Sequence, residues 1–208
     1  TIAYRLNGKA TYAIEGSIFM AGASIQWLRD ALKLIGSARE TEAIANATPK
    51  NHGVTLVPAF TGLGAPYWDP DARAAIMGLT RDSGINEIVT AALESVCYQT
   101  KDLQKAMEQD GLRPNIIRVD GGMVENNWLL AFLANILDAD VERPKNIETT
   151  ALGAAYLAGL QQGIFSSLDE LAAKWHCQQK FTGSLSEQQR NSMYEKWRVA
   201  VNKVRSQA

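Results

Sequence analysis

The N-terminal part of the chain changes from short β-prone runs to helical spacing. Residues 2–6 and 10–14 are β-prone, and Asn7-Gly8 between them is the dipeptide that best suits a tight hairpin turn. We therefore expect the chain to begin with a β-hairpin. From Gly22 the apolar positions fall on one helical face, made of Ile25, Leu28, Leu32 and Ile35. Gly36 is expected to end this helix with a left-handed cap.

The central part of the chain predicts two buried strands and one long helix. The strands are expected at residues 54–60 and 74–79. The loop at residues 61–70 is rich in glycine, proline and aromatic residues and must be ordered, with Asp69 capping backbone amides. The long helix ends at Gly111, and one apolar stripe marks it: Ile85, Ile88, Val89, Ala92, Val96, Thr100, Leu103 and Met107.

The C-terminal part alternates strands and helices. Strands at residues 115–119 and 140–143 each precede a helix, at residues 126–137 and 150–161. This βαβα succession implies a parallel segment of sheet. Capping-box patterns that begin at Ser167 and Ser186 open two more helices. The last helix is expected to bury its apolar residues Met193, Trp197 and Val201 or Val204.

Composition narrows the class of protein. The 208 residues are 46% apolar and 21% charged, as in ordinary soluble globular domains. A net charge of -1 provides no field for nucleic acid or anionic lipid, so neither is expected as a partner. Cys97 and Cys177 do not make a disulfide framework, which indicates a reducing cytoplasm, and their spacing does not resemble a metal site.

Nothing in the sequence predicts a membrane span or a signal peptide, because no apolar run reaches about 18 residues and no basic leader opens the chain. The opening residues 1–4 resemble a strand that has been cut into. We therefore expect an N-terminal part of the protein to precede Thr1.

The sharpest local motif is a strand that runs into paired glycines. Residues 117–120 lead to Gly121-Gly122, and Asn126 then opens a helix. Glycines at the end of a strand let the backbone approach a ligand, and a helix N-terminus offers free N–H groups, as in nucleotide sites of α/β folds. The alternative is a tight turn that needs a positive φ and binds nothing. On its own, the glycine pair does not decide between the two.

A dinucleotide site is a competing interpretation. Glu142 ends the next strand about 20 residues later, where an acidic ribose ligand would lie. However, the Gly-x-Gly-x-x-Gly pattern is broken, because Asn126 stands where its third glycine would allow the helix to pack on the strand. The sequence therefore disfavours a dehydrogenase.

Other candidates have ordinary explanations beside the functional ones. An anion could bind at the N–H groups where Gly22 opens a helix with small residues. Gln26 lies off the apolar stripe of that helix, and its ordinary explanation is a solvated side chain. Asp69 and Asp71 could suggest acid–base work or Mg²⁺, but no third ligand is near, so a structural loop is favoured. His52 and His176 are isolated in the sequence and are expected to be surface or partly buried residues without a catalytic role. No Ser/His/Asp or Cys/His nucleophile set is present.

The order of these segments resembles the glycerol kinases of the FGGY carbohydrate kinase family. Residues 21–30 and 57–70 carry the closest likeness, and residues 78–81 followed by 91–95 resemble the second family signature. The likeness continues through Val119-Asp120-Gly121-Gly122 with Asn126-Asn127 and through residues 150–159. It covers nearly the whole chain and fades after about Ser166. Departures include Ala74, which stands where the family usually has glycine, and Met123, which replaces a small residue.

This resemblance implies an actin-like (ribonuclease H-like) α/β fold with a mixed sheet flanked by helices. Residues 1–208 would form the C-terminal, adenine-nucleotide-binding domain. The positions that match ATP or ADP contacts in the family are Gly22, Gln26, Gly122 and Asn126. Asp120 and Gly121 match the adenosine motif of the superfamily.

The resemblance also implies a second domain, with Mg²⁺-ATP reaching across a cleft and the polyol held by the first domain. The catalytic aspartate, both phosphate loops and the polyol-binding residues would precede Thr1, so no catalytic or metal residue is assigned here and the chain alone is expected to be inactive. The expected reaction is ATP-dependent phosphorylation of glycerol, in a cytoplasmic homodimer or tetramer of whole enzymes. The alternatives are a kinase of another polyol or ketose, and an actin-like ATP-binding module without transfer activity.

Overall fold

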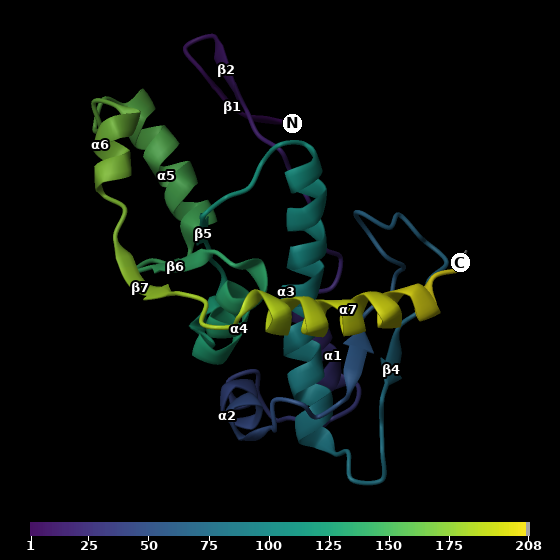
Figure 1. Ribbon diagram of the computed structural model, residues 1–208. Helices are drawn as coiled ribbons and strands as arrows, with labels where there is room; N and C mark the ends of the chain where they lie inside the picture. The colour runs from purple at the N-terminus through teal and green to yellow at the C-terminus, as the bar shows by residue number, and fades with distance from the viewer. Residues whose placement is uncertain (207–208) are drawn as a thin grey trace. The chain divides into compact units, whose positions relative to one another are not determined.

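The computed structural model describes residues 1–206 (Figure 1). The chain forms two compact units. Unit 1 contains Thr1–Arg113 together with the residues from Asn191 onward, and unit 2 contains Pro114–Arg190.

Unit 1 begins with the expected hairpin. Strands β1 (Ile2–Leu6) and β2 (Lys9–Tyr12) pair antiparallel. Asn7 and Gly8 form the turn with φ of 50° and 79°, and these left-handed conformations suit asparagine and glycine. The second strand ends at Tyr12, before the predicted boundary.

Helix α1 (Gly22–Asp30) begins where the sequence predicts and ends earlier. The backbone turns through Lys33, which has a φ of 56°, and the N–H of Leu34 donates to the carbonyl of Leu28 at 2.9 Å. Leu32 lies beyond the end of α1 and is 41% exposed, so the predicted stripe does not continue as a helix. The prediction of a cap at Gly36 is therefore wrong, because a lysine takes the left-handed position that glycine usually occupies.

The remaining elements of unit 1 surround the long helix α3 (Ile85–Gln109). Strands β3 (Thr55–Val57) and β4 (Ala75–Met77) pair antiparallel and confirm the two predicted strands in shorter form, but β4 is half-buried along its length, so its predicted burial is wrong. Helix α2 (Glu40–Ala47) packs on α3 and was not predicted from the pattern. Its buried residues are Thr41 and Ala45, so it has no large apolar face for periodicity to detect.

Helix α7 (Glu187–Val204) crosses α3 in the part that belongs to unit 1 (Figure 1). As predicted, Trp197 and Val201 are buried, but Met193 is only half-buried and the neighbouring Tyr194 is buried instead. The Asp102 carboxylate of α3 accepts hydrogen bonds from the Tyr194 hydroxyl and from Trp197 Nε1, the latter at 2.8 Å. Burial raises the pKa of the Asp102 carboxyl, and these hydrogen bonds oppose the rise. The cluster ties α7 to α3.

The glycine-rich loop at residues 61–70 is ordered as predicted. Asp69 Oδ1 accepts hydrogen bonds from the backbone N–H groups of Asp71, at 3.1 Å, and Ala72, at 3.0 Å. The same carboxylate accepts the backbone N–H and the hydroxyl of Ser206, each at 2.7 Å. Asp69 is thus a structural cap, as expected from the sequence.

Unit 2 contains a mixed sheet of three strands. Strands β5 (Ile116–Arg118) and β6 (Asp140–Pro144) pair parallel, and β7 (Cys177–Phe181) pairs antiparallel with β6. A short 3₁₀ helix, η1 (Gly122–Glu125), and helix α4 (Asn127–Leu137) connect β5 to β6, and α5 (Thr149–Gln161) and α6 (Leu168–Ala173) follow. The predicted βαβα succession and its parallel pairing are confirmed. Strand β7, with the polar sequence CQQKF, was not predicted.

Both predicted helix starts carry their capping residues. Ser167 Oγ accepts the N–H of Glu170 at 3.1 Å, and Ser186 Oγ accepts the N–H of Gln189 at 3.3 Å. Gln189 Oε1 accepts the Ser186 N–H in return, at 2.9 Å, which completes a capping box.

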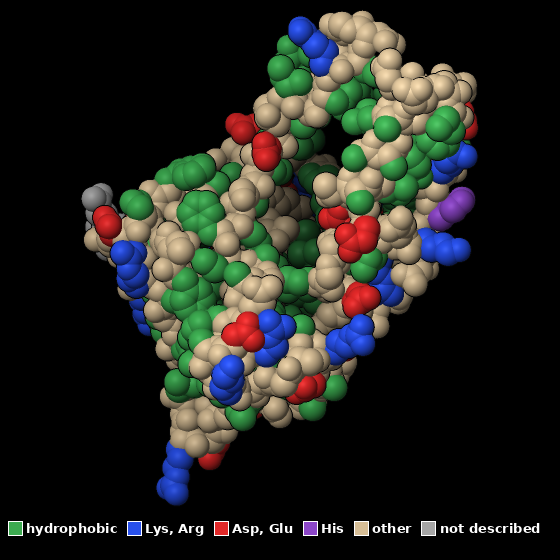
Figure 2. Space-filling model, turned by 180° about the vertical axis from the view of Figure 1, so that it is seen from behind, with side chains coloured by type: hydrophobic (Ala, Val, Ile, Leu, Met, Phe, Trp, Pro, Cys, Tyr) green, Lys and Arg blue, Asp and Glu red, His purple; other side chains and the backbone are tan. Residues whose placement is uncertain are grey.

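The surface carries mixed charge, as the composition suggests. Acidic and basic side chains are interspersed among apolar ones on the face in Figure 2. Helix α5 is apolar, yet only its Gly159 is buried.

Within residues 1–206, no helix has both the length and the apolar character needed to cross a membrane. Cys97 and Cys177 are both free thiols.

Candidate functional site

The backbone after β5 forms an open loop around the paired glycines. Gly121 has a φ of 83°, a conformation that side chains rarely adopt, and its N–H donates to the carbonyl of Ile147 at 3.0 Å. A Cβ atom placed on Gly121 or on Gly122 would meet nothing within 4 Å. Gly122 has no such left-handed φ. The absence of side chains therefore leaves space directly against the backbone, as a ligand would require.

Asn126 closes this loop and opens α4. Its backbone is extended, and its Oδ1 accepts the N–H of Leu129 at 2.9 Å, as an N-cap does. The predicted helix start is confirmed. The N–H groups of the first turn of α4 lie directly after the loop, which is the arrangement that favours an anion.

Asp120 is held at the end of β5. The Thr149 hydroxyl, at the start of α5, donates a hydrogen bond to the Asp120 carboxylate. Together with the Gly121 to Ile147 hydrogen bond, this contact fixes the loop to the segment between β6 and α5. Asp120, Gly121, Gly122 and Asn126 therefore lie together in one loop of unit 2.

The second candidate segment lies in unit 1, where Gly22 begins α1. The N-cap position is Ala21, and no side chain in the described chain caps this helix. The N–H of Ser24 donates to the Ala21 carbonyl at 3.1 Å, whereas the Ser24 hydroxyl is buried without a hydrogen-bond partner among residues 1–206. Gln26 is exposed. Gln99 Nε2, from α3, donates to the Met20 carbonyl at 3.1 Å and holds the segment before the helix.

Gly22 and Gln26 thus lie in one unit, and Asp120, Gly121, Gly122 and Asn126 lie in the other. Their convergence on a single ligand stays a prediction.

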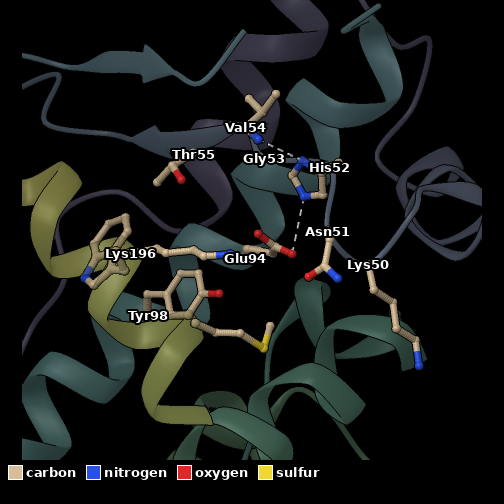
Figure 3. A pocket seen from close by; sticks show the side chains of 11 residues that line it. Lys50, Asn51, His52, Gly53, Val54, Thr55, Glu94, Tyr98 and Lys196 are labelled. Carbon is tan, nitrogen blue, oxygen red and sulfur yellow. Dashed lines mark hydrogen bonds and ion pairs between the residues drawn. The ribbon is translucent and has the colours of Figure 1, made fainter. Parts of the chain in front are cut away.

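Unit 1 also contains a cavity of about 60 Å³ (Figure 3). Residues 50–55, the α3 side chains of Glu94 and Tyr98, and α7 line it. His52 Nδ1 accepts the N–H of Val54 at 3.3 Å, and His52 Nε2 lies 3.5 Å from Glu94 Oε1. The His52 and Glu94 side chains are 4% and 12% exposed, and His52 as a whole residue is half-buried, as one of the two positions expected from the sequence.

This cavity is not the candidate site. Cofactor pockets measure roughly 300 Å³ or more, so this space is too small for a nucleotide. None of the six predicted site residues lines it.

Comparison with known proteins decides the family. Residues 3–161 match the FGGY family of carbohydrate kinases, C-terminal domain. The chain belongs to this family of carbohydrate kinases. The resemblance found in the sequence motifs is therefore confirmed.

Close relatives of this FGGY chain include bacterial glycerol kinases. It is 64% identical over 205 residues to the glycerol kinase of Alteromonas mediterranea, covering 99% of this chain and 42% of that protein. It is 60% identical over 208 residues to glycerol kinase 1 of Pseudomonas aeruginosa, covering 100% of this chain and 42% of that protein. The chain thus spans 42% of the length of these relatives.

Solved structures agree with this placement. The structure of Plasmodium falciparum glycerol kinase with ADP matches with a TM-score of 0.89 and 36% identity, over 100% of this chain and 42% of that chain. The ligand-bound xylulose kinase of Lactobacillus acidophilus matches with a TM-score of 0.74 and 21% identity, over 91% of this chain and 38% of that chain, and shows the fold alone. The FGGY chain therefore has the predicted actin-like α/β fold.

Proposed function

We propose that this chain is the adenine-nucleotide-binding part of an enzyme that transfers the γ-phosphate of ATP to a terminal hydroxyl of glycerol. The observation that carries the proposal is the full-length match of the chain to a glycerol kinase whose structure contains ADP. Identity of 64% to another glycerol kinase supports glycerol over a ketose, because the xylulose kinases match at about one third of that identity.

In this proposal the two helix openings hold the nucleotide. Gly122 and Asn126 of unit 2, and Gly22 and Gln26 of unit 1, contact ATP or ADP, while Asp120 and Gly121 shape the adenosine side. Backbone N–H groups and short polar side chains suit this task because they approach phosphate and ribose oxygens closely. The open space at Gly121 and Gly122 supports the assignment.

The catalytic base and the polyol pocket are assigned to the part of the protein that this chain does not cover. Phosphoryl transfer depends on positioning and on neutralising charge, with a carboxylate that accepts the hydroxyl proton. Mg²⁺ neutralises phosphate charge when bound with ATP. Among residues 1–206, no group of three Asp, Glu, His or Cys side chains could hold a metal ion.

The cellular setting belongs to the same proposal. We place the whole enzyme in the cytoplasm as a homo-oligomer that takes adenine nucleotide and glycerol, with neither nucleic acid nor membrane as a partner. The two free thiols support a reducing compartment.

The test is an assay of the full-length protein that carries this chain, with glycerol, xylulose and gluconate as competing acceptors of phosphate from ATP. Glycerol should give the highest kcat/KM. Preference for another acceptor would replace the substrate in this proposal. Binding of ATP without transfer to any acceptor would favour a non-catalytic actin-like module instead.

One variant tests the nucleotide site itself. Gly122→Val adds a side chain where the backbone is open and where φ imposes no strain. It should raise the KM for ATP about tenfold while leaving thermal stability unchanged. Gly153→Val is the matched control, because Gly153 also faces open space in unit 2 and is no part of the proposed site. An unchanged KM in a folded Gly122→Val protein would remove the assignment.

A further inference from the structure

Arg143 of β6 is a buried cation whose hydrogen-bond partners are neutral oxygens. The residue is 8% exposed. Its guanidinium donates to two backbone carbonyls and to three side-chain amides. Removing a charged group from water is costly, so a buried charged side chain often contributes little net stability to the fold. The position of this guanidinium therefore suggests a role in fixing geometry.

One edge of the guanidinium holds the candidate nucleotide loop from behind. Arg143 Nη1 donates to the carbonyl of Val124 at 2.9 Å, to that of Glu125 at 3.4 Å, and to Asn127 Oδ1 at 3.0 Å. These partners are the last two residues of η1 and the first residue of α4. Asn126 lies between Glu125 and Asn127, so one nitrogen of Arg143 fixes the chain on both sides of the proposed nucleotide contact.

The rest of the guanidinium is anchored on β7. Arg143 Nε donates to Gln178 Oε1 at 3.1 Å, and Nη2 donates to Gln179 Oε1 at 2.6 Å. The Phe181 ring centre lies 5.6 Å from the guanidinium carbon. The planar fork is thereby held by the sheet and cannot turn without losing contacts on both sides.

The peptide bond transmits this constraint to the loop. Because the peptide unit is planar, fixing the carbonyls of Val124 and Glu125 fixes the planes of both peptides that lead into Asn126. The orientation of these planes sets where Asn126 and the first N–H groups of α4 stand relative to the open backbone at Gly122.

We propose that Arg143 is a positioning residue for nucleotide binding, which holds the loop from Gly122 to Asn126 in its binding geometry without touching the nucleotide. The inference rests on the proposed function, since it assumes that this loop contacts ATP. A purely structural residue would act on folding and on both substrates alike, whereas a positioning residue acts on the nucleotide.

The test compares Arg143→Gln with Arg118→Gln in the full-length protein. Arg118 lies on the neighbouring strand β5, its side chain is 62% exposed, and it pairs with Glu142 at 3.6 Å, so it controls for loss of an arginine from the same sheet. Arg143→Gln should raise the KM for ATP about tenfold while kcat and the KM for glycerol stay within about twofold. Arg118→Gln should leave all three constants within about twofold.

A conservative variant keeps the test valid if Arg143→Gln does not fold. Arg143→Lys retains the charge but loses the fork, so it should raise the KM for ATP about threefold, between the wild type and Arg143→Gln. The inference is overturned if folded Arg143 variants leave the KM for ATP unchanged, or if the KM values for ATP and glycerol rise together.

Gly122→Val separates this inference from the proposed function. If Gly122→Val raises the KM for ATP and the Arg143 variants do not, the nucleotide site stands and the role of Arg143 is wrong. If Gly122→Val also leaves that KM unchanged, the nucleotide site itself is misplaced, and the inference fails with it.

Discussion

The two helix openings assigned to the nucleotide are built differently. At α4 the loop has a left-handed glycine at Gly121, a side-chain cap from Asn126 and the buried guanidinium of Arg143 behind it. At α1 the N-cap is an alanine, and the preceding segment is held by the amide of Gln99. The first opening is fixed before any ligand arrives, whereas the second presents an exposed glutamine, Gln26.

This difference indicates that the two openings contribute to the free energy of nucleotide binding in different ways. A preorganised loop loses little conformational freedom when a ligand binds, but its residues also stabilise the fold. An exposed glutamine must be ordered on binding, yet it contributes little to folding. Loss of a contact that holds the α4 loop should therefore alter stability and affinity together, whereas loss of the Gln26 side chain should alter affinity alone.

The largest effect, a loss of glycerol turnover, is expected when this chain, which carries both helix openings, is produced without the rest of the enzyme. Residues 1–208 alone should fold, because they contain capped helices and an apolar core. Turnover of glycerol should fall by about a thousandfold or more, since the γ-phosphate and the hydroxyl are no longer positioned. Circular dichroism checks the folding, and a coupled kinase assay beside the intact enzyme checks the turnover. Turnover within about tenfold of the intact enzyme would mean that this chain holds the catalytic groups.

The next effect concerns the left-handed glycine of the α4 loop. Gly121→Val forces a β-branched residue into a φ of 83° and should cost about 1–3 kcal/mol of stability, with a clear loss of ADP affinity. Gly111→Val is the matched control, because Gly111 has a φ of 85°, also faces open space and lies at the end of α3. It should lose similar stability and keep its ADP affinity. Equal loss of affinity in both variants would show that the loop has no special relation to the ligand.

A smaller effect separates the two openings directly. Asn126→Ala should lower both the melting temperature and the ADP affinity, whereas Gln26→Ala should lower only the ADP affinity. In each variant the ADP affinity should fall about fivefold, which corresponds to roughly 1 kcal/mol. Asn126→Asp keeps an oxygen for the Leu129 N–H but replaces the amide donor, so it should keep the cap and still weaken ADP binding. Titration calorimetry in the full-length protein measures both affinities. A melting temperature that falls in Gln26→Ala would contradict the distinction.

The smallest effect is a pH dependence in the sheet of unit 2. A hydrogen bond from Lys180, at 2.7 Å, and one from the Thr182 hydroxyl, at 2.8 Å, hold the pKa of the Asp140 carboxyl below its usual value. The carboxylate therefore contributes stability above the unfolded pKa of about 3.9, and this contribution is lost as pH falls through the lower folded pKa.

Asp140→Asn removes that contribution. Urea unfolding of the wild type and the variant should show the largest difference near neutral pH and a vanishing difference at strongly acidic pH. ADP affinity at neutral pH should stay unchanged, because the side chain that holds the loop is Arg143 and not Asp140. A difference that grows on acidification would contradict the lowered pKa of the Asp140 carboxyl in the folded protein.

Local chemistry made part of the fold predictable. Asn7-Gly8 specifies a hairpin, Ser186 with Gln189 specifies a helix start, and Asp69 caps nearby amides. Each of these signals acts within a few residues, so the sequence alone contains it. The open loop at Gly121 was predictable for the same reason, whereas the assignment of Gln26 to a nucleotide came from resemblance to the family.

Features that depend on distant contacts were not predictable. Helix α1 ends before its apolar stripe does, with a lysine in the left-handed position, and the polar strand β7 forms because β6 offers it an edge. The burial of Arg143 depends on amides from β7, so it could not be read from the sequence DVERP. Its place at the end of a parallel strand beside the glycine loop was the available signal.

The most direct test of the central claim is a crystal structure of the full-length protein with ADP. The account predicts that the side chains of Gln26 and Asn126 both lie within hydrogen-bond distance of the nucleotide, with the backbones of Gly22 and Gly122 against it and Arg143 behind the loop. A structure with Gln26 and Asn126 on opposite faces, or with ADP bound away from both helix openings, would contradict it.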